Sequence, residues 1–148
     1  MKGFETAWLP GRFQAVTIRN RDVIFDVGHN PDAAKAFCSS FGKILKGKSI
    51  CFVLGIMKDK DIAGMMVHYA AVASRIICTA PAPERSACPE TLQKHIPAVF
   101  KGARSVVPTV AAAIELAFKS TENLICIAGS FFTVGEGMEY LKIDPYRY

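Results

Sequence analysis

The sequence predicts an α/β domain: a Rossmann-like, doubly wound, mostly parallel sheet of about six strands. Short apolar runs alternate with amphipathic segments along the chain, and most of these runs are apolar throughout. Strands of that kind, separated by helices, are typical of a parallel sheet that is covered on both faces. A length of 148 residues with 51% hydrophobic residues suits one domain with a substantial core.

The apolar runs predict strands at residues 15–18, 23–26, 50–54, 76–79, 105–107 and 124–128. The amphipathic stretches predict helices at residues 32–45, 61–73, 89–95, 110–119 and 133–141. Only residues 19–22 separate the first two runs, which suits a hairpin and therefore one antiparallel edge strand. No repeat, low-complexity tract or linker divides the sequence, so we expect residues 1–148 to form one domain.

The net charge of +5 is scattered along the chain and has no aromatic residues interleaved with it. This pattern argues against nucleic-acid binding and favours small polyanions such as nucleotides. No apolar run reaches the roughly 18 residues that a membrane-spanning helix needs, so no membrane partner is expected.

The five cysteines are odd in number and lack CxxC spacing. Cys51, Cys78 and Cys126 each lie inside an apolar run, where a thiol behaves as a small hydrophobic group. The pattern indicates a reducing cytoplasm and argues against disulfides or a metal cluster.

In doubly wound sheets, ligands bind beyond the carboxyl ends of the strands. The segment DVGHNP at residues 26–31 ends one expected strand and begins a helix. Asp26 can accept bonds from ribose hydroxyls or hold a cation, and the helix start favours an anion. The alternative is local: Asn30 caps the helix, Gly28 permits the turn, and His29 packs against its neighbours.

Residues 55–61 also join a strand to a helix, and this loop is strongly charged. Lys58 or Lys60 can reach a carboxylate or phosphate held at the sheet edge. The alternative is a solvated surface turn in which Asp59 or Asp61 caps the helix.

Two further residues become candidates for ligand binding only because these two loops are also present. Arg12 follows a Pro-Gly turn, where its guanidinium can fork onto a phosphate, although an exposed arginine is usually just solvated. Ser130 follows the last strand, and its hydroxyl can donate to a ligand or simply cap the next helix.

The segment GKILKGKS at residues 42–49 fits the phosphate-loop expression G-x-x-x-x-G-K-[ST]. That motif requires a strand before it and a helix after it, so that helix-start amides surround phosphate. Here the expected helix precedes the segment and the expected strand follows it. We therefore predict that it is not a phosphate loop. A G-x-G-x-x-G dinucleotide fingerprint is also missing from the first strands.

The segments PGRFQ at residues 10–14 and DVGHNP at 26–31 closely resemble the C-terminal domain of folylpolyglutamate synthase and dihydrofolate synthase, in the Mur ligase superfamily. Residues 53–61 and 128–134 resemble the same family, so the likeness covers nearly the whole chain. A small departure is Val27-Gly28, where many relatives have Gly-Ala.

The resemblance implies an ATP-dependent ligase. In that family ATP phosphorylates a folate or pteroate carboxyl group, and the amine of L-glutamate attacks the acyl phosphate, with magnesium offsetting the phosphate charge. The resemblance implies ATP contacts for Arg12, Asp26 and Asn30. It implies glutamate contacts for His29, Lys60 and Ser130, of which His29 and Lys60 also serve catalysis.

In the family, the true phosphate loop, the magnesium ligands and most of the folate pocket lie in an N-terminal domain that is absent from this sequence. We therefore expect residues 1–148 to supply one wall of an interdomain site and to be inactive alone. Two alternatives stay open: another Mur-type amino-acid ligase, and a free-standing module that binds a nucleotide or amino acid without catalysis. The choice between dihydropteroate and folates that already carry glutamate also stays open.

Overall fold

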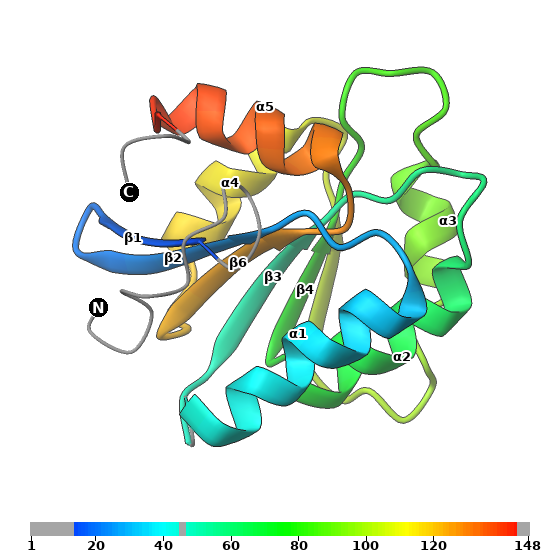
Figure 1. Cartoon of the computed structure of the whole chain (residues 1–148), viewed down its shortest axis with the longest axis horizontal. Helices are drawn as coiled ribbons and strands as arrows, with labels where there is room; N and C mark the ends of the chain where they lie inside the picture. Colours follow the sequence, from blue (N-terminus) through cyan, green and yellow to red (C-terminus); the bar gives the residue numbers. More distant parts are fainter. Residues whose placement is uncertain (1–13, 45–46, 145–148) are drawn as a thin grey trace.

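The computed structural model describes residues 14–44 and 47–144, which form a six-stranded sheet with helices on both faces (Figure 1). The strands are β1 (Gln14–Ile18), β2 (Arg21–Asp26), β3 (Ile50–Leu54), β4 (Arg75–Cys78), β5 (Ala103–Val106) and β6 (Leu124–Ala128). The helices are α1 (Pro31–Ile44), α2 (Ile62–Val72), α3 (Pro89–Lys94), α4 (Val110–Lys119) and α5 (Phe131–Leu141).

The strand order is β1-β2-β6-β3-β4-β5, and only the β1–β2 pair is antiparallel. The predicted fold class is therefore confirmed, including the antiparallel edge. The hairpin turn is shorter than expected, because Arg21 and Asp22 already belong to β2. Arg19 and Asn20 make the turn with φ angles of 52° and 61°, the positive values that a tight two-residue hairpin requires.

Two apolar layers cover the sheet, one on each face. Helices α1, α2 and α3 pack on one side, and α4 and α5 pack on the other (Figure 1). Successive residues of β3 alternate between the layers: Phe52 and Leu54 join the first cluster, and Cys51 and Val53 join the second. Because both faces are buried, the central strands β3 and β6 are apolar throughout, which is the pattern that predicted the parallel sheet.

The cysteines of the strands belong to this core. Burial raises the pKa of the Cys51 and Cys78 thiols to about 12, and all five cysteines are free thiols. Among residues 14–44 and 47–144, no helix has both the length and the apolar character needed to cross a membrane.

The strand register brings four loops to one edge of the sheet. Strand β6 lies between β2 and β3, and Asp26, Ala128 and Leu54 are level with one another. Cys78 is level with Leu54 on the next strand. Because these strands are parallel, the segments that follow β2, β6, β3 and β4 all leave the sheet at its carboxyl edge.

Helix boundaries differ from expectation by a few residues. Helix α5 begins at Phe131, two residues earlier than predicted, because Ser130 caps it. Around the phosphate-loop-like segment, α1 ends at Ile44 and β3 begins at Ile50, so the helix precedes the strand as predicted. Residues 45–46 of that segment lie outside the described part.

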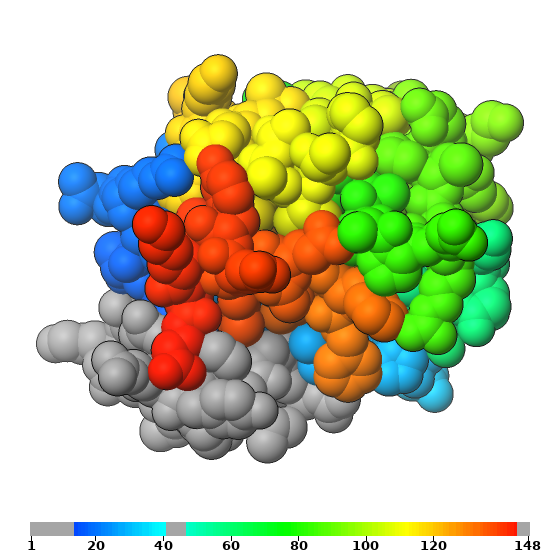
Figure 2. Space-filling model, turned by 90° about the horizontal axis from the view of Figure 1, so that it is seen from above, coloured from blue at the N-terminus to red at the C-terminus, as the bar shows by residue number. Residues whose placement is uncertain are grey.

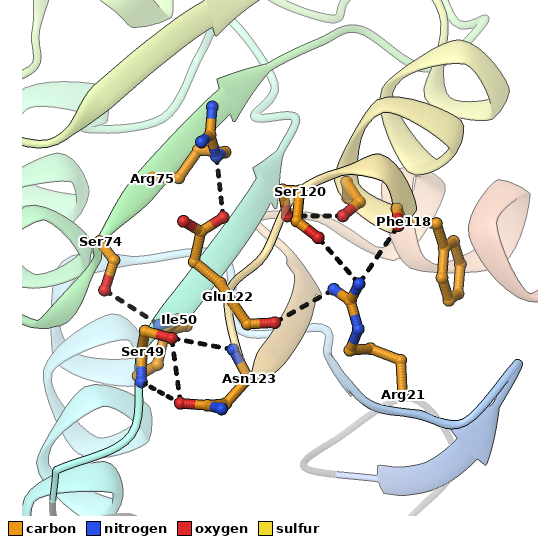
Figure 3. A network of polar contacts seen from close by, with 10 residues as sticks. Arg21, Ser49, Ile50, Ser74, Arg75, Phe118, Ser120, Glu122 and Asn123 are labelled. Carbon is orange, nitrogen blue, oxygen red and sulfur yellow. Dashed lines mark hydrogen bonds and ion pairs between the residues drawn. The ribbon is translucent and has the colours of Figure 1, made fainter.

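The opposite, amino edge of the sheet carries a network of polar contacts (Figure 3). The Arg21 guanidinium donates to the carbonyl oxygens of Phe118, Ser120 and Glu122 at 3.2, 2.8 and 3.1 Å. Arg75 Nε donates to Glu122 Oε1 at 2.8 Å. Burial alone would raise the pKa of Glu122, but hydrogen bonds from Arg75 and Ser120 and the Arg75 charge bring it below its ordinary value.

Candidate functional site

A small cavity of about 150 Å³ lies at the carboxyl edge of the sheet. Its lining comes from the segments that follow β2, β3 and β4 and from the start of α5. It consists of His29, Met57, Asp59, Lys60, Arg85, Ser130, Phe131 and Phe132. The cavity therefore brings together the three residues that the resemblance implies for glutamate, although they are about 100 positions apart in sequence.

His29 is held on two sides. Its Nδ1 lies 3.3 Å from the carbonyl oxygen of Val27, and its ring centroid lies 5.6 Å from that of Phe131 at an interplanar angle of 41°. When Nδ1 carries the proton and donates to Val27, Nε2 has a free lone pair. His29 in that tautomer can accept a proton or a hydrogen bond from a ligand amine.

Lys60 lies in a turn that directly precedes α2. Its amide donates to the carbonyl of Met57 at 3.2 Å, and Asp61 caps the helix by accepting from the Gly64 amide at 2.9 Å. The capping role expected for Asp59 or Asp61 therefore belongs to Asp61. Asp59 remains exposed in the lining of the cavity, beside Lys60.

Ser130 is 2% exposed and is committed to local bonds. Its Oγ accepts from the Thr133 amide at 3.1 Å and lies 2.8 Å from Thr133 Oγ1. Thr133 Oγ1 gives its own proton to the carbonyl of Gly55 at 2.8 Å, so the Ser130 hydroxyl is the donor in the bond between the two. The prediction that Ser130 donates to a ligand is therefore not supported by this geometry. One lone pair of the Ser130 Oγ remains to accept a hydrogen bond from a ligand.

Gly129 permits the close approach of β6 to the loop after β3. Its φ is +111°, and a Cβ atom there would lie 2.5 Å from the carbonyl oxygen of Gly55. Any side chain would therefore be strained and would collide with backbone. This contact sets the distance between the segment that carries Ser130 and the one that carries Lys60.

Two of the residues expected to contact ATP, Asp26 and Asn30, do not line the cavity. Asp26 is 4% exposed, and its Oδ2 accepts from the Gly28 amide at 3.1 Å. Asn30 Oδ1 accepts from the Ala33 amide at 2.8 Å, so Asn30 caps α1, as its local alternative predicted. Arg12 lies outside the described residues.

The cavity and its surroundings fit some ligands better than others. Pockets for drug-sized ligands such as nucleotides measure about 300–1,000 Å³, so 150 Å³ suits a molecule the size of an amino acid. Within residues 14–44 and 47–144, no group of three or more His, Cys, Asp or Glu side chains is placed to hold a metal ion.

Arg85 is a lining residue that the sequence motifs did not identify. Its guanidinium carbon lies 4.7 Å from the centroid of the Phe132 ring. The position of residues 80–85 after an expected strand was a signal for this loop, but no motif distinguished Arg85 within it. Figure 2 shows the loop, in green, beside the orange part of α5. The Ala82 amide of this loop donates to Glu136 Oε2, in the middle of α5, at 2.6 Å.

Comparisons with known proteins agree with the fold and the motifs. The dihydrofolate synthase/folylpolyglutamate synthase of Escherichia coli is 35% identical over 141 residues, which are 94% of this chain and 32% of the relative. The structure of E. coli FolC in complex with DHPP and ADP has a TM-score of 0.81 and 33% identity, and the match covers 93% of this chain and 32% of that one.

A bifunctional folylpolyglutamate synthase/dihydrofolate synthase with Mn, AMPPNP and L-glutamate bound has a TM-score of 0.80 and 29% identity, over 93% of this chain and 33% of that one. This chain thus spans about a third of the length of these relatives. Residues 11–131 match the family described as "Mur ligase, glutamate ligase domain". The chain belongs to this family.

Proposed function

We propose that this chain is the C-terminal domain of an ATP-dependent ligase that adds L-glutamate to folate or dihydropteroate through an acyl phosphate. In this proposal it supplies ATP and glutamate contacts at a site shared with an N-terminal domain. The observation that carries the proposal is the cavity of about 150 Å³ in which His29, Lys60 and Ser130 meet. An amino-acid-sized cavity lined by a lysine and an imidazole suits the amino-acid half of such a reaction.

The chemistry required of this domain is positioning. Lys60 pairs with a carboxylate of glutamate, and His29 Nε2 accepts the proton that the glutamate ammonium group must lose before the amine attacks. Ser130 contributes only a hydrogen-bond acceptor. Holding the amine in line with an activated carboxyl group lowers the entropic barrier of the attack, and no residue of this chain needs to form a covalent bond.

On the ATP side of the site, this chain is proposed to supply fewer contacts than the N-terminal domain does. Arg12, Asp26 and Asn30 are proposed to contact ATP, and the resemblance to the family places the magnesium ligands in the N-terminal domain. Phe131 and Phe132 are 58% and 36% exposed at the cavity, and exposed aromatic rings of this kind suit a surface that another domain covers. The five free thiols support a cytoplasmic location.

A replacement experiment tests the proposal. The matching third of the E. coli relative is exchanged for this chain, and ADP release is measured with dihydropteroate, ATP, Mg²⁺ and L-glutamate. We expect turnover that requires all three substrates in the hybrid, and none from the isolated chain. Dihydropteroate-dependent ATP turnover by the isolated chain would contradict the half-site. A folded hybrid that binds ATP but ligates no glutamate would contradict the ligase function.

The same assay separates the two alternatives. A hybrid that accepts meso-diaminopimelate in place of L-glutamate would favour another Mur-type amino-acid ligase. A free-standing binding module would bind ATP or an amino acid tightly as the isolated chain, whereas a half-site binds ATP weakly because most phosphate contacts are missing. Calorimetric titration of the isolated chain with ATP distinguishes these cases.

A further inference from the structure

We infer that Arg85 is a second carboxylate-binding residue of the cavity and that, together with Lys60, it selects an amino acid with two carboxylates. The inference rests on the proposed function, because it concerns the same cavity, but it adds a residue and a reason for substrate choice. It follows from the position of the Arg85 side chain, from the loop that carries it, and from the charges around the cavity.

The Arg85 side chain is held by an aromatic ring and keeps its donors free. Its guanidinium carbon lies 4.7 Å from the centroid of Phe132, which is within the range of a cation–π contact. A cation–π contact engages the positive charge of the guanidinium and uses no hydrogen-bond acceptor, so N–H donors remain for a carboxylate. In the part of the chain that the structure describes, no hydrogen bond or ion pair engages the Arg85 guanidinium or the Lys60 ammonium.

The two basic residues stand on loops that are fastened to each other. The Lys58 amide donates to the carbonyl of Arg85 at 2.7 Å, and Met57 and Ser86 form an isolated antiparallel bridge. On its other side the loop after β4 is fastened to α5 through Ala82 and Glu136, as described above. The backbone therefore sets the separation of the Lys60 and Arg85 attachment points, and a ligand does not have to order the loops.

The charges of the cavity match a dicarboxylic amino acid. Lys60 and Arg85 supply two positive charges and Asp59 supplies one negative charge. A zwitterionic dicarboxylic amino acid carries two carboxylates and one ammonium, so each of its charges has an opposite charge to meet. Inorganic phosphate offers no positive group to Asp59, which argues against a simple phosphate site.

The test uses the whole chain, labelled with ¹⁵N, and follows its amide and arginine Nε resonances during titration with L-glutamate, L-glutamine and inorganic phosphate. The variants are Arg85→Gln, which removes the charge, and Arg85→Lys, which keeps the charge but loses the planar fork. The matched control is Arg104→Gln. Arg104 also stacks on a phenylalanine, at 5.2 Å from the Phe100 centroid, but it lies on β5 outside the cavity.

We expect L-glutamate to bind the unmodified chain more tightly than L-glutamine and to shift the resonances of His29, Lys60 and Arg85. Arg85→Gln should raise the Kd for L-glutamate about tenfold, as expected for one charged hydrogen-bonded pair, and should abolish the preference over L-glutamine. The Kd of Arg85→Lys for L-glutamate should lie between those of the unmodified chain and Arg85→Gln. The Kd of Arg104→Gln should equal that of the unmodified chain.

Two results would overturn the inference and leave the proposed function standing. One is that Arg85→Gln binds L-glutamate with an unchanged Kd and an unchanged preference over L-glutamine, while the Lys60 shifts persist. The other is that phosphate shifts the cavity resonances at lower concentration than L-glutamate does. A third result, in which L-glutamate shifts no cavity resonance of the unmodified chain, would instead remove the glutamate site itself and, with it, both proposals.

Discussion

The two edges of the sheet use the same kinds of charged side chain in opposite ways. At the amino edge, Arg21 and Arg75 are bonded to carbonyl oxygens and to a carboxylate (Figure 3). At the carboxyl edge, Lys60 and Arg85 line a cavity and make no ion pair with any described residue. Charges that are paired within the protein hold elements together, whereas unpaired charges at a cavity are available to a ligand.

Local structure explains the difference. Strand β2 begins beside the end of α4, whose last carbonyl groups have no partner within the helix. Arg21 donates to the carbonyl oxygens of Phe118 in the last turn of α4, of the C-cap residue Ser120, and of Glu122 just beyond it. At the carboxyl edge the helices α2 and α5 begin, and Asp61 and Ser130 cap them. The groups that need partners at a helix start are N–H donors, which acidic and hydroxyl side chains can satisfy and the donor-only side chains of Lys60 and Arg85 cannot.

The largest effect on the free energy of unfolding is expected from Gly129→Ala, which disrupts the backbone contact at the carboxyl edge of the sheet. The substitution forces a side chain into a positive-φ position and against the Gly55 carbonyl, so it should lower the free energy of unfolding by about 3 kcal/mol or more. Urea denaturation measures this. Gly135→Ala is the control: its Cβ would meet nothing within 4 Å, and it should stabilise α5 by about 0.5–1 kcal/mol. Equal effects at both glycines would refute the close-approach argument.

Arg21→Ala tests the amino edge. Three carbonyl oxygens lose their charged donor, so the free energy of unfolding should fall by about 2 kcal/mol. L-glutamate binding, followed by NMR, should not change, because the network lies at the other edge. If Arg21→Ala weakened L-glutamate binding in protein that is still folded, the separation of the two edges would be wrong.

Glu122→Gln tests the same edge through pH. The pKa of Glu122 is below its ordinary value of 4.5 in the folded protein. Its charged form therefore stabilises the fold above pH 4.5, and this contribution is lost as pH falls through the lower folded pKa. The substitution should cost about 1 kcal/mol at pH 7. The gap between the two proteins should close on acidification below pH 4.5, as urea titrations at several pH values will show. A gap that widens on acidification would reverse the assigned direction.

The smallest effect on stability is expected from Lys60→Ala. Its ammonium makes no ion pair with a described residue, so the free energy of unfolding should change by less than about 0.5 kcal/mol. The same substitution should abolish the L-glutamate shifts at His29. Loss of stability comparable to that of Arg21→Ala would mean that Lys60 is structural.

Most of the fold could be predicted because its signals are local. Apolar runs, amphipathic segments and the short connection at residues 19–22 predicted the antiparallel edge and each of the six strands and five helices found within residues 14–44 and 47–144. Errors were confined to boundaries. The start of α5 was predicted two residues late, because two bulky aromatic residues, Phe131 and Phe132, do not indicate a helix start, although Ser130 caps the helix.

The candidate site could be predicted only in part. The motifs identified His29, Lys60 and Ser130, and the structure places all three at one cavity. The proton of Ser130 could not be assigned from sequence, because its donor role depends on a bond between Thr133 and Gly55, a residue in the loop that follows β3. Arg85 was missed because its side chain is positioned at the cavity by contact with Phe132, which is 47 positions away in the chain.

The sequence by itself determined which segments become strands and helices, because alternation of apolar and polar residues acts over a few neighbouring positions. It also determined which strand ends carry charged or glycine-rich loops. Only the tertiary structure decided that β6 lies between β2 and β3. That insertion brings the loops of His29, Lys60 and Ser130 together, and the close contact at Gly129 fixes their separation. Long-range packing and register therefore turned separate motifs into one cavity and left Lys60 and Arg85 facing the same space.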